Sequence, residues 1–221
     1  MERFICRTLS VAALIWVGAQ TTLADSSQIK VLDEKSSAVQ YAVVSLKPLF
    51  EASLNMPADA EPAVKQSGAL FSPFVLPVRR GATVSFPNFD EFRHHVYSFS
   101  KTKRFQLRLY GQDETKHIVF DEAGVVALGC NIHDNMLAYV YVTDNPYFKT
   151  TGASGSVEFE ALEVGEYEIY VWHPDLKDKL KQKYGKLVVS KDMTGAMPTI
   201  ISLELRKVRK MQLAPAEDDY S

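Results

Sequence analysis

The sequence has few cysteines and almost no excess of charge of either sign. Two cysteines among 221 residues exclude a small fold held together by several disulfides. The 25 basic and 27 acidic residues give a formal net charge of -2, so no basic footprint indicates nucleic-acid binding. Because 46% of the residues are apolar, the composition is that of an ordinary globular protein and not of a disordered chain.

The sequence also lacks an apolar run long enough to cross a bilayer. Its most pronounced run, LSVAALIWVGA, follows Arg3 and Arg7 and has the length of a signal-peptide core. Thr22-Leu23-Ala24 then suits a signal peptidase, so residues 1–24 are predicted to be a signal peptide cut before Asp25. An uncleaved anchor is the alternative. With cleavage, we expect a periplasmic protein without stable membrane insertion.

Removal of residues 1–24 would take Cys6 away and leave Cys130 as the one cysteine of the mature chain. A lone cysteine cannot form an internal disulfide, and an exposed thiol is a liability in an oxidising compartment. Cys130 is therefore either a buried small hydrophobe or a metal ligand. Its neighbours in the sequence have to decide between the two.

Helix signals are scarce, and short strand signals dominate. β-Branched and aromatic residues alternate with polar ones, with Gly, Pro, Asn and Asp between the segments, which predicts an all-β sandwich or barrel. The predicted strands cover residues 29–32, 42–46, 74–78, 83–86, 95–99, 105–110, 116–120, 124–130, 137–143, 156–159, 165–172, 186–189 and 199–205.

Two breaks in composition divide the chain. NMPADAEPAV near residues 55–64 and TDNPYFKTTGASG near residues 143–155 bracket a central unit of about 80 residues, an ordinary size for a small domain. After the signal peptide, the predicted parts are N-terminal strands, a central domain, a C-terminal β-rich part and a loose Pro-, Ala- and acid-rich tail. Their ranges are 25–61, 62–144, 145–210 and 211–221.

The chemistry lies in residues 130–136, which read CNIHDNM. Cys130, His133 and Met136 offer a thiolate, an imidazole and a thioether within seven residues, between two predicted strands. Completed by a second histidine, these are the ligands of a blue-copper electron-transfer site, whereas a hydrolytic zinc centre uses three harder ligands and an open position. Strand alternation turns the sulfurs of Cys130 and Met136 toward apolar faces.

The fourth donor is expected from the segment FPNFDEFRHHVYSFS at residues 86–100. His94 and His95 are adjacent there, and adjacent strand residues face opposite sides of a sheet. Only one of the two can therefore bind the same metal. Strand alternation leaves the choice between them open.

Residues 64–144 resemble a cupredoxin of the plastocyanin and amicyanin type. The resemblance rests on Phe71, Pro73, Val78 and Gly81 in an FxPxxxxVxxG opening, on VSFPNFDEFRHHV, and on FDEAGVVALGCNIHDNM with an amicyanin-like Cys-x-x-His-x-x-Met spacing. It implies a Greek-key β-barrel that binds copper as Cu(I) and Cu(II).

The same resemblance implies that His94 is the fourth ligand, with His95 as the alternative. The sequence departs from the family pattern at two positions, because Ile132 stands where proline is usual and His95 where asparagine is usual. Both positions adjoin ligands, so these changes are expected to alter the reduction potential and not the identity of the metal.

The flanking segments have a second resemblance. Residues 29–48 and 150–174 are similar to the opening and closing parts of a carboxypeptidase-regulatory-like, transthyretin-type β-sandwich. This similarity implies a second small β-sandwich into which the cupredoxin domain is inserted. The combination also resembles periplasmic proteins labelled as methylamine-utilisation proteins.

These patterns together lead us to expect a periplasmic one-electron carrier or redox module and not an enzyme, because no nucleophile constellation or second metal cluster is evident. A periplasmic redox protein or dehydrogenase is the expected partner, docking near His133. A copper-binding or delivery protein that never cycles electrons is the alternative. His117 is expected to be an exposed strand residue and His173 to cap a turn.

Overall fold

The computed structural model describes residues 26–52, 61–112, 114–179, 182–191 and 196–207. The predicted signal peptide (1–24) and tail (211–221) lie outside these ranges. All named elements in the described part are strands, and the protein is all-β. No helix there has the length and apolarity needed to cross a membrane.

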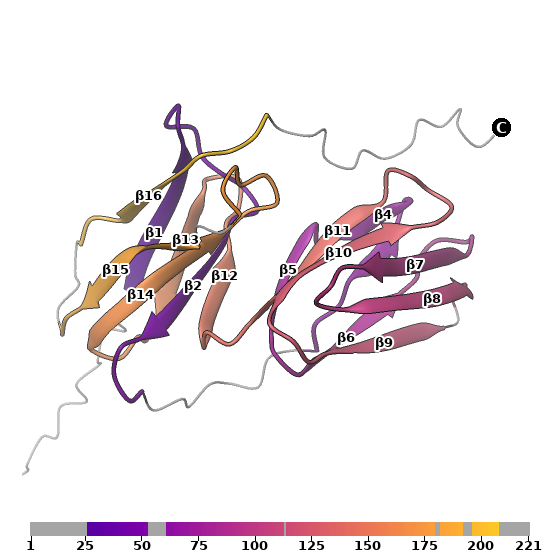
Figure 1. The fold of residues 1–221 in the computed structure, drawn as a ribbon, viewed down its shortest axis with the longest axis horizontal. Coiled ribbons are helices and arrows are strands. Elements are labelled where there is room, and N and C mark those ends of the chain that lie inside the picture. Colours follow the sequence, from indigo (N-terminus) through magenta and orange to yellow (C-terminus); the bar gives the residue numbers. More distant parts are fainter. Residues whose placement is uncertain (1–25, 53–60, 113, 180–181, 192–195, 208–221) are drawn as a thin grey trace, which may run out of the picture.

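The central unit is built around a five-stranded sheet of order β5-β11-β10-β7-β8 (Figure 1). Two further strand pairs, β3-β4 and β6-β9, lie against it and enclose an apolar core. The strands are β3 (Lys65–Ser67), β4 (Leu70–Ser72), β5 (Val75–Arg79), β6 (Ala82–Pro87), β7 (His94–Phe99), β8 (Arg104–Tyr110), β9 (Thr115–Phe120), β10 (Gly124–Cys130) and β11 (Leu137–Thr143).

The outer unit combines strands from both sides of the central one. Its two sheets have the orders β13-β1-β16 and β12-β2-β14-β15, with a second apolar core between them. Strand β1, which precedes the central unit in the chain, pairs with β13 and β16, which follow it. The strands are β1 (Ser26–Asp33), β2 (Val43–Pro48), β12 (Tyr147–Thr150), β13 (Ser156–Glu160), β14 (Gly165–Trp172), β15 (Lys183–Val189) and β16 (Thr199–Leu203).

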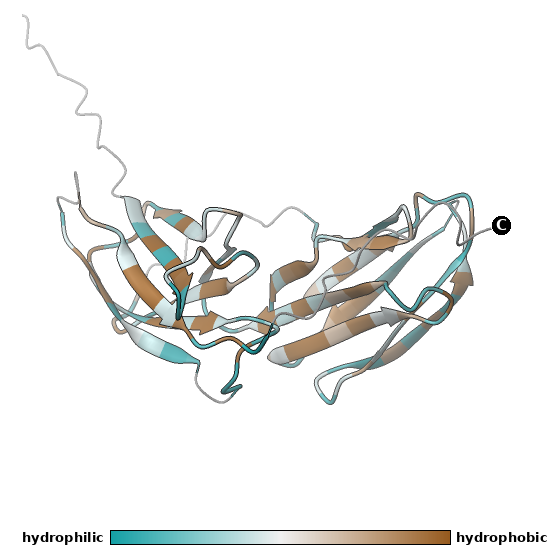
Figure 2. Cartoon of the chain, turned by 90° about the horizontal axis from the view of Figure 1, so that it is seen from above, coloured by the Kyte–Doolittle hydropathy of each residue, from teal (hydrophilic) through white to brown (hydrophobic). Residues whose placement is uncertain are grey.

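Alternation of apolar and polar residues explains why these segments form half-buried strands. In β7 the first, third and fifth residues are buried, and in β10 Val126, Leu128 and Cys130 are buried. A period of two turns one set of side chains into the core and the other outward. Figure 2 shows the resulting apolar stretches on the strands of both units.

Each predicted strand overlaps an observed one, and the predicted bounds 124–130, 137–143 and 165–172 are identical to the observed ones. The strands β3, β4 and β12 were not predicted. The stretch near residues 143–155, expected to be a turn-rich break, contains β12, because Tyr147 and Phe148 pair with Leu46 and Ser45 of β2. The strands β3 and β4 have three residues each, too few to show a period.

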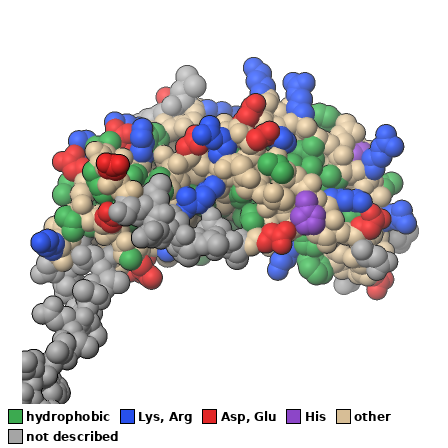
Figure 3. Space-filling model, turned by 90° about the horizontal axis from the view of Figure 1, so that it is seen from below, with side chains coloured by type: hydrophobic (Ala, Val, Ile, Leu, Met, Phe, Trp, Pro, Cys, Tyr) green, Lys and Arg blue, Asp and Glu red, His purple; other side chains and the backbone are tan. Residues whose placement is uncertain are grey.

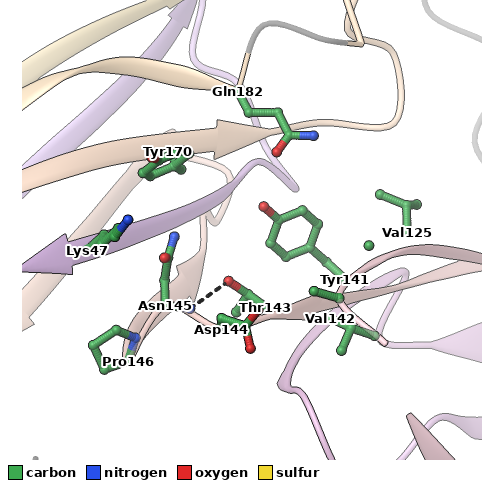
Figure 4. Close-up of a pocket in the computed structure, with 12 residues that line it drawn as sticks. Lys47, Val125, Tyr141, Val142, Thr143, Asp144, Asn145, Pro146, Tyr170 and Gln182 are labelled. Carbon is green, nitrogen blue, oxygen red and sulfur yellow. Dashed lines mark hydrogen bonds between the residues drawn. The ribbon is translucent and has the colours of Figure 1, made fainter. Parts of the chain in front are cut away.

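Aromatic rings join the two units. The Trp172 ring at the end of β14 stacks on Tyr141 of β11, with centroids 5.4 Å apart, and meets Tyr139 edge-on at 5.7 Å. Beside Tyr141 a cleft of about 520 Å³ separates β11 from Tyr170 and Gln182 of the outer unit (Figure 4). The contact therefore leaves an open cleft at the junction.

Candidate metal centre

Strands β7 and β10 bring the first two candidate donors together. They are antiparallel neighbours, and Cys130 at the end of β10 pairs with Val96 of β7. His94, two residues before Val96, shares its inward face, and both side chains are fully buried. The Cys130 side chain is also in this core, with 4% of its surface exposed.

Three nitrogen and sulfur atoms meet at this point. His94 Nδ1 lies 3.7 Å from Cys130 Sγ, and His133 Nδ1 lies 3.9 Å from the same sulfur. Ligand atoms of all three residues lie within 4.8 Å of one another. Two ligands bonded to one ion at about 2.0–2.3 Å are separated by roughly 3.5–4 Å, so these residues fit a shared metal.

Met136 closes the loop that carries His133. Its backbone N–H donates to the His133 carbonyl at 3.1 Å, and β11 begins one residue later. The Met136 side chain is 2% exposed and belongs to the same core as Cys130. The loop thus returns a buried thioether to the core that holds the thiol.

The two adjacent histidines face opposite ways. His94 points into the core toward Cys130, whereas the His95 ring lies on the other face of β7, 6.5 Å from the Tyr97 ring. The Nε2 atom of His95 is buried without a hydrogen-bond partner among the described residues. The structure therefore groups His94, and not His95, with Cys130 and His133.

Asp90 contacts the candidate site and was missed by sequence reasoning. Its Oδ2 lies 2.7 Å from His94 Nε2, and the carboxylate also accepts the Gly68 and Ala69 amides at 2.6 and 3.1 Å. A carboxylate on the far nitrogen of a histidine fixes its tautomer, leaving Nδ1 to a metal. Its place four residues before His94 is not a pattern that selects it from the sequence alone.

Hydrogen bonds set the protonation of Cys130. Burial opposes ionisation of the thiol, but hydrogen bonds from His94, the backbone amides of Ile132 and His95, and His133 outweigh it and lower the pKa from 9.0 to about 6. The thiolate is the form that binds metal. The lowered pKa of Cys130 therefore favours the binding of a cation at this site.

The pKa of His94 moves in the opposite direction. Burial lowers it, but the hydrogen bonds and negative charges of Cys130 and Asp90 outweigh burial and raise the pKa above 6.5. Asp90 contacts Nε2 of the His94 ring and Cys130 contacts Nδ1. Because metal ligands bind in deprotonated form, a metal at Nδ1 would compete with a proton at that atom.

His133 lies at the surface end of the site. It is half-buried, and the Phe92 ring lies 5.3 Å from its ring and 5.1 Å from that of His94. Phe89, Phe92 and Ile132 are exposed to 57%, 40% and 48%. An apolar surface therefore surrounds the one candidate donor that reaches toward solvent.

The other two described histidines lie elsewhere. His117 on β9 is exposed, and its Nε2 is 3.3 Å from a Glu61 oxygen. His173 accepts the Asp175 amide on Nδ1 at 3.1 Å, and Nε2 lies 3.1 Å from the Gln40 carbonyl. His173 thus caps the turn after β14, as predicted, and His117 is the predicted exposed strand residue.

The chain matches no protein-family model and no curated protein sequence. Among solved structures, a copper-containing nitrite reductase (NirK) from Thermus scotoductus SA-01 is 25% identical over 44% of this chain, with a TM-score of 0.37. The chain covers 25% of the length of that protein.

Two smaller proteins are similar over their whole length. A reduced Cu(I) form of an amicyanin mutant is 21% identical, covers 45% of this chain and 99% of its own, and has a TM-score of 0.35. A purple cupredoxin from Nitrosopumilus maritimus is 24% identical, covers 38% and 100%, and has a TM-score of 0.34. Because these TM-scores are low, the all-β assignment rests on the sheets of this chain, and the candidate site rests on the positions of its own donor atoms.

Proposed function

We propose that this chain is a periplasmic type 1 copper protein that carries one electron at a time, alone or as a redox module of a larger assembly. The observation that carries the proposal is the cluster of His94, Cys130 and His133 ligand atoms within 4.8 Å of one another, with Met136 buried in the same core. A thiolate, two imidazoles and a weak thioether are the donor set of such sites.

Bound copper would supply a one-electron couple between Cu(I) and Cu(II). The residues of the chain supply a fixed frame for it. His94 and Cys130 lie on paired strands, and the Asp90 carboxylate holds the His94 ring. Donors that are fixed before the electron arrives rearrange little when the charge changes, which favours fast transfer.

Electron transfer also needs a surface through which the electron enters or leaves. The half-buried His133 ring, together with exposed Phe89, Phe92 and Ile132, offers such a surface. A small apolar surface suits the transient contacts of redox partners. We propose that a periplasmic redox protein or dehydrogenase docks there. The chain would then be a carrier and not an enzyme.

We propose a docking or anchoring role for the outer unit. Its strands come from both ends of the chain, which agrees with a central domain inserted into a carboxypeptidase-regulatory-like sandwich. The boundaries 25–61, 62–144 and 145–210, and the signal peptide, are part of this proposal. Mass determination of the exported protein would locate its first residue, expected at Asp25.

Protein-film voltammetry of the copper-loaded protein tests the carrier function. A carrier gives a reversible one-electron wave and retains copper in both oxidation states during dialysis against a chelator. A delivery protein, the competing function, loses Cu(I) to the chelator and gives no reversible wave. That second result would overturn the proposal while leaving copper binding in place.

A further inference from the structure

The outward face of β7 carries a row of aromatic rings that the metal centre does not use. His95, Tyr97 and Phe99 alternate with the buried residues of the strand. Ring centroids are 6.5 Å apart from His95 to Tyr97 and 4.9 Å from Tyr97 to Phe99. Phe99 is 65% exposed, so the row runs from the ligand segment to solvent.

This row contacts the chain beside Cys130 at two points. Tyr97 pairs with Gly129, and a Cβ on Gly129 would lie 2.7 Å from Tyr97 Cζ, so the Tyr97 ring covers the residue just before the thiol. The backbone amide of His95 donates to the Cys130 sulfur. Packed rings and one hydrogen bond thus join the sulfur to the surface.

The edge of this face is cationic. Arg104 pairs with Phe99 and Gln106 with Tyr97, and by alternation Arg108 shares their exposed face. Lys101 is exposed in the turn after β7. Within the described part of the chain, Lys101, Arg104 and Arg108 have no ion-pair partner. In the view of Figure 3, Lys and Arg side chains are spread over the surface, several of them beside Asp and Glu side chains.

The junction with the outer unit extends this cationic surface. Ser100, next to Phe99, lines a cleft of about 350 Å³ together with Trp172, and the cleft carries Lys179 and Arg206 against Asp175. On a chain of net charge -2, this concentration of positive charge is local. The chain near His133 differs, because exposed Asp134 follows it directly, and exposed Glu91 and Arg93 flank Phe92, whose ring lies 5.3 Å from the His133 ring.

We propose that this aromatic and cationic face is a second electron port, which docks an acidic one-electron redox protein. The inference rests on the proposed copper function. The partner loses one electron and the site gains it, Cu(II) becoming Cu(I), and the same electron later leaves through the His133 edge to a different acceptor. No bond is made or broken. Entry and exit on separate faces let donor and acceptor bind without competing.

Two observations favour a redox protein over another polyanion. The rings lead to the Cys130 sulfur, which a nucleic acid or lipid surface would not need. The exposed Phe99 beside cations gives an apolar contact with a charged rim, which suits a protein interface. Charge complementarity selects the acidic partner.

Small charged complexes test the port without knowledge of the partner. We expect the copper-loaded protein to be reduced by anionic hexacyanoferrate(II) faster at ~0.01 M than at ~1 M ionic strength, because the Debye length falls from about 30 to 3 Å. In Arg104→Glu/Arg108→Glu the rate at low salt should drop at least about tenfold. Oxidation by cationic tris(phenanthroline)cobalt(III), which favours the acidic His133 edge, should not slow.

The control is Lys35→Glu/Lys65→Glu, which makes the same change in net charge at exposed positions away from this face. It should retain most of the hexacyanoferrate(II) rate. For the aromatic path, Tyr97→Leu should slow hexacyanoferrate(II) reduction severalfold at ~1 M ionic strength, whereas Tyr97→Phe should keep the wild-type rate. Equal rates in all four variants would overturn the port.

A copper-free readout separates this inference from the proposed function. Paramagnetic hexacyanochromate(III) should broaden the NMR amide signals of Phe99, Arg104 and Arg108 in the metal-free protein, and the double Arg variant should abolish the effect. Broadening centred on His133 would contradict the port. Broadening at Phe99 without any effect of the variants on the rates would make the face an anion-binding surface only, and the port would be wrong. Absence of a copper–thiolate band would instead refute the proposed function.

Discussion

Ile132 donates a backbone N–H to the Cys130 sulfur, and His95 donates another. The cupredoxin resemblance places a proline at position 132, which would have no N–H to give. Hydrogen bonds to the cysteine sulfur are among the factors that set the potential of such a site. They withdraw charge from the thiolate and so favour the reduced metal.

Ile132→Pro should therefore lower the reduction potential of the copper-loaded protein. Loss of one hydrogen bond is worth about 1 kcal/mol, which for one electron corresponds to roughly 40 mV. Voltammetry measures the shift, with Ile132→Ala as a control that removes the side chain and keeps the N–H. An unchanged or higher potential in Ile132→Pro would show that this amide does not tune the site.

The pKa of Cys130 gives a prediction for the metal-free protein. Because the pKa falls from 9.0 to about 6 on folding, thiolate absorbance in the ultraviolet should titrate with a midpoint near pH 6. A lowered pKa stabilises the fold above pH 9.0, and this contribution is lost as the pH falls through about 6. Compared with Cys130→Ser, the wild-type stability should thus decline over this window. A midpoint near 9 would contradict the hydrogen bonding described.

At the residue scale, the candidate donors could be selected from the sequence because Cys130, His133 and Met136 fall within one short segment. The choice between His94 and His95 needed a resemblance, since alternation permits either face to be the inner one. Asp90 could not be chosen from the sequence. Its role depends on the Gly68 and Ala69 amides, which reach it from a different hairpin.

At the scale of elements, the β3-β4 hairpin supports the loop that leads to His94. Its turn donates the Gly68 and Ala69 amides to Asp90, and the Gln66 carbonyl accepts the Phe89 amide at 2.8 Å. Gly68 and Ala69 have φ angles of 61° and 53°, which a tight turn requires. A hairpin far from the donors in sequence therefore fixes one of them.

Asp90→Ala should uncouple this hairpin from the site. It leaves two backbone N–H groups and His94 Nε2 without their acceptor, and unsatisfied buried donors cost about 1–3 kcal/mol each. We expect at least about 3 kcal/mol lower stability in denaturant and roughly 10- to 100-fold weaker copper binding in chelator competition. Asp90→Asn, which keeps an acceptor oxygen, should lose less. Wild-type copper affinity in Asp90→Ala would contradict a positioning role.

Elements with several alternating residues, such as β10 and β11, could be predicted to the residue. The strand β12 was not predicted because Asn145, Pro146 and Gly152 give the surrounding sequence the composition of a loop. What makes residues 147–150 a strand is pairing with β2, more than 100 residues earlier. Long-range pairing of this kind leaves no local pattern.

At the scale of the whole molecule, the units meet at Trp172, whose indole is 6% exposed. It lies at the end of β14 and packs on Tyr139 and Tyr141 of β11. Ser100, just after β7, lines the cleft beside Trp172, so His94 lies at the opposite end of β7. The junction is thus on the outward face of the central sheet, whereas His94 and Cys130 are buried in its core.

Trp172→Ala should weaken the outer unit and the junction but leave the copper spectrum unchanged. Truncation of a buried tryptophan costs about 3–5 kcal/mol. Thermal unfolding followed by circular dichroism should show a lower first transition. A shifted copper absorption band in this variant would mean that the site depends on the outer unit.

Two β-rich parts could be predicted from composition breaks, but their contact could not. Tyr139 and Tyr141 look like ordinary outward residues of β11, and only the tertiary structure shows them covered by Trp172. The cationic face has the same origin. Arg104 lies beside Phe99, and Lys179 lines a cleft with Ser100, through folding and not through their spacing in the chain.

The visible absorption spectrum of the metal-free protein on addition of one equivalent of Cu(II) tests the central claim most directly. An intense copper–thiolate charge-transfer band that saturates at one copper per chain, and that is absent in Cys130→Ser, is the predicted result. His95→Ala should keep the band, and His94→Ala should weaken or shift it. A colourless wild-type complex, or a band that survives in Cys130→Ser, would contradict a copper site built on Cys130.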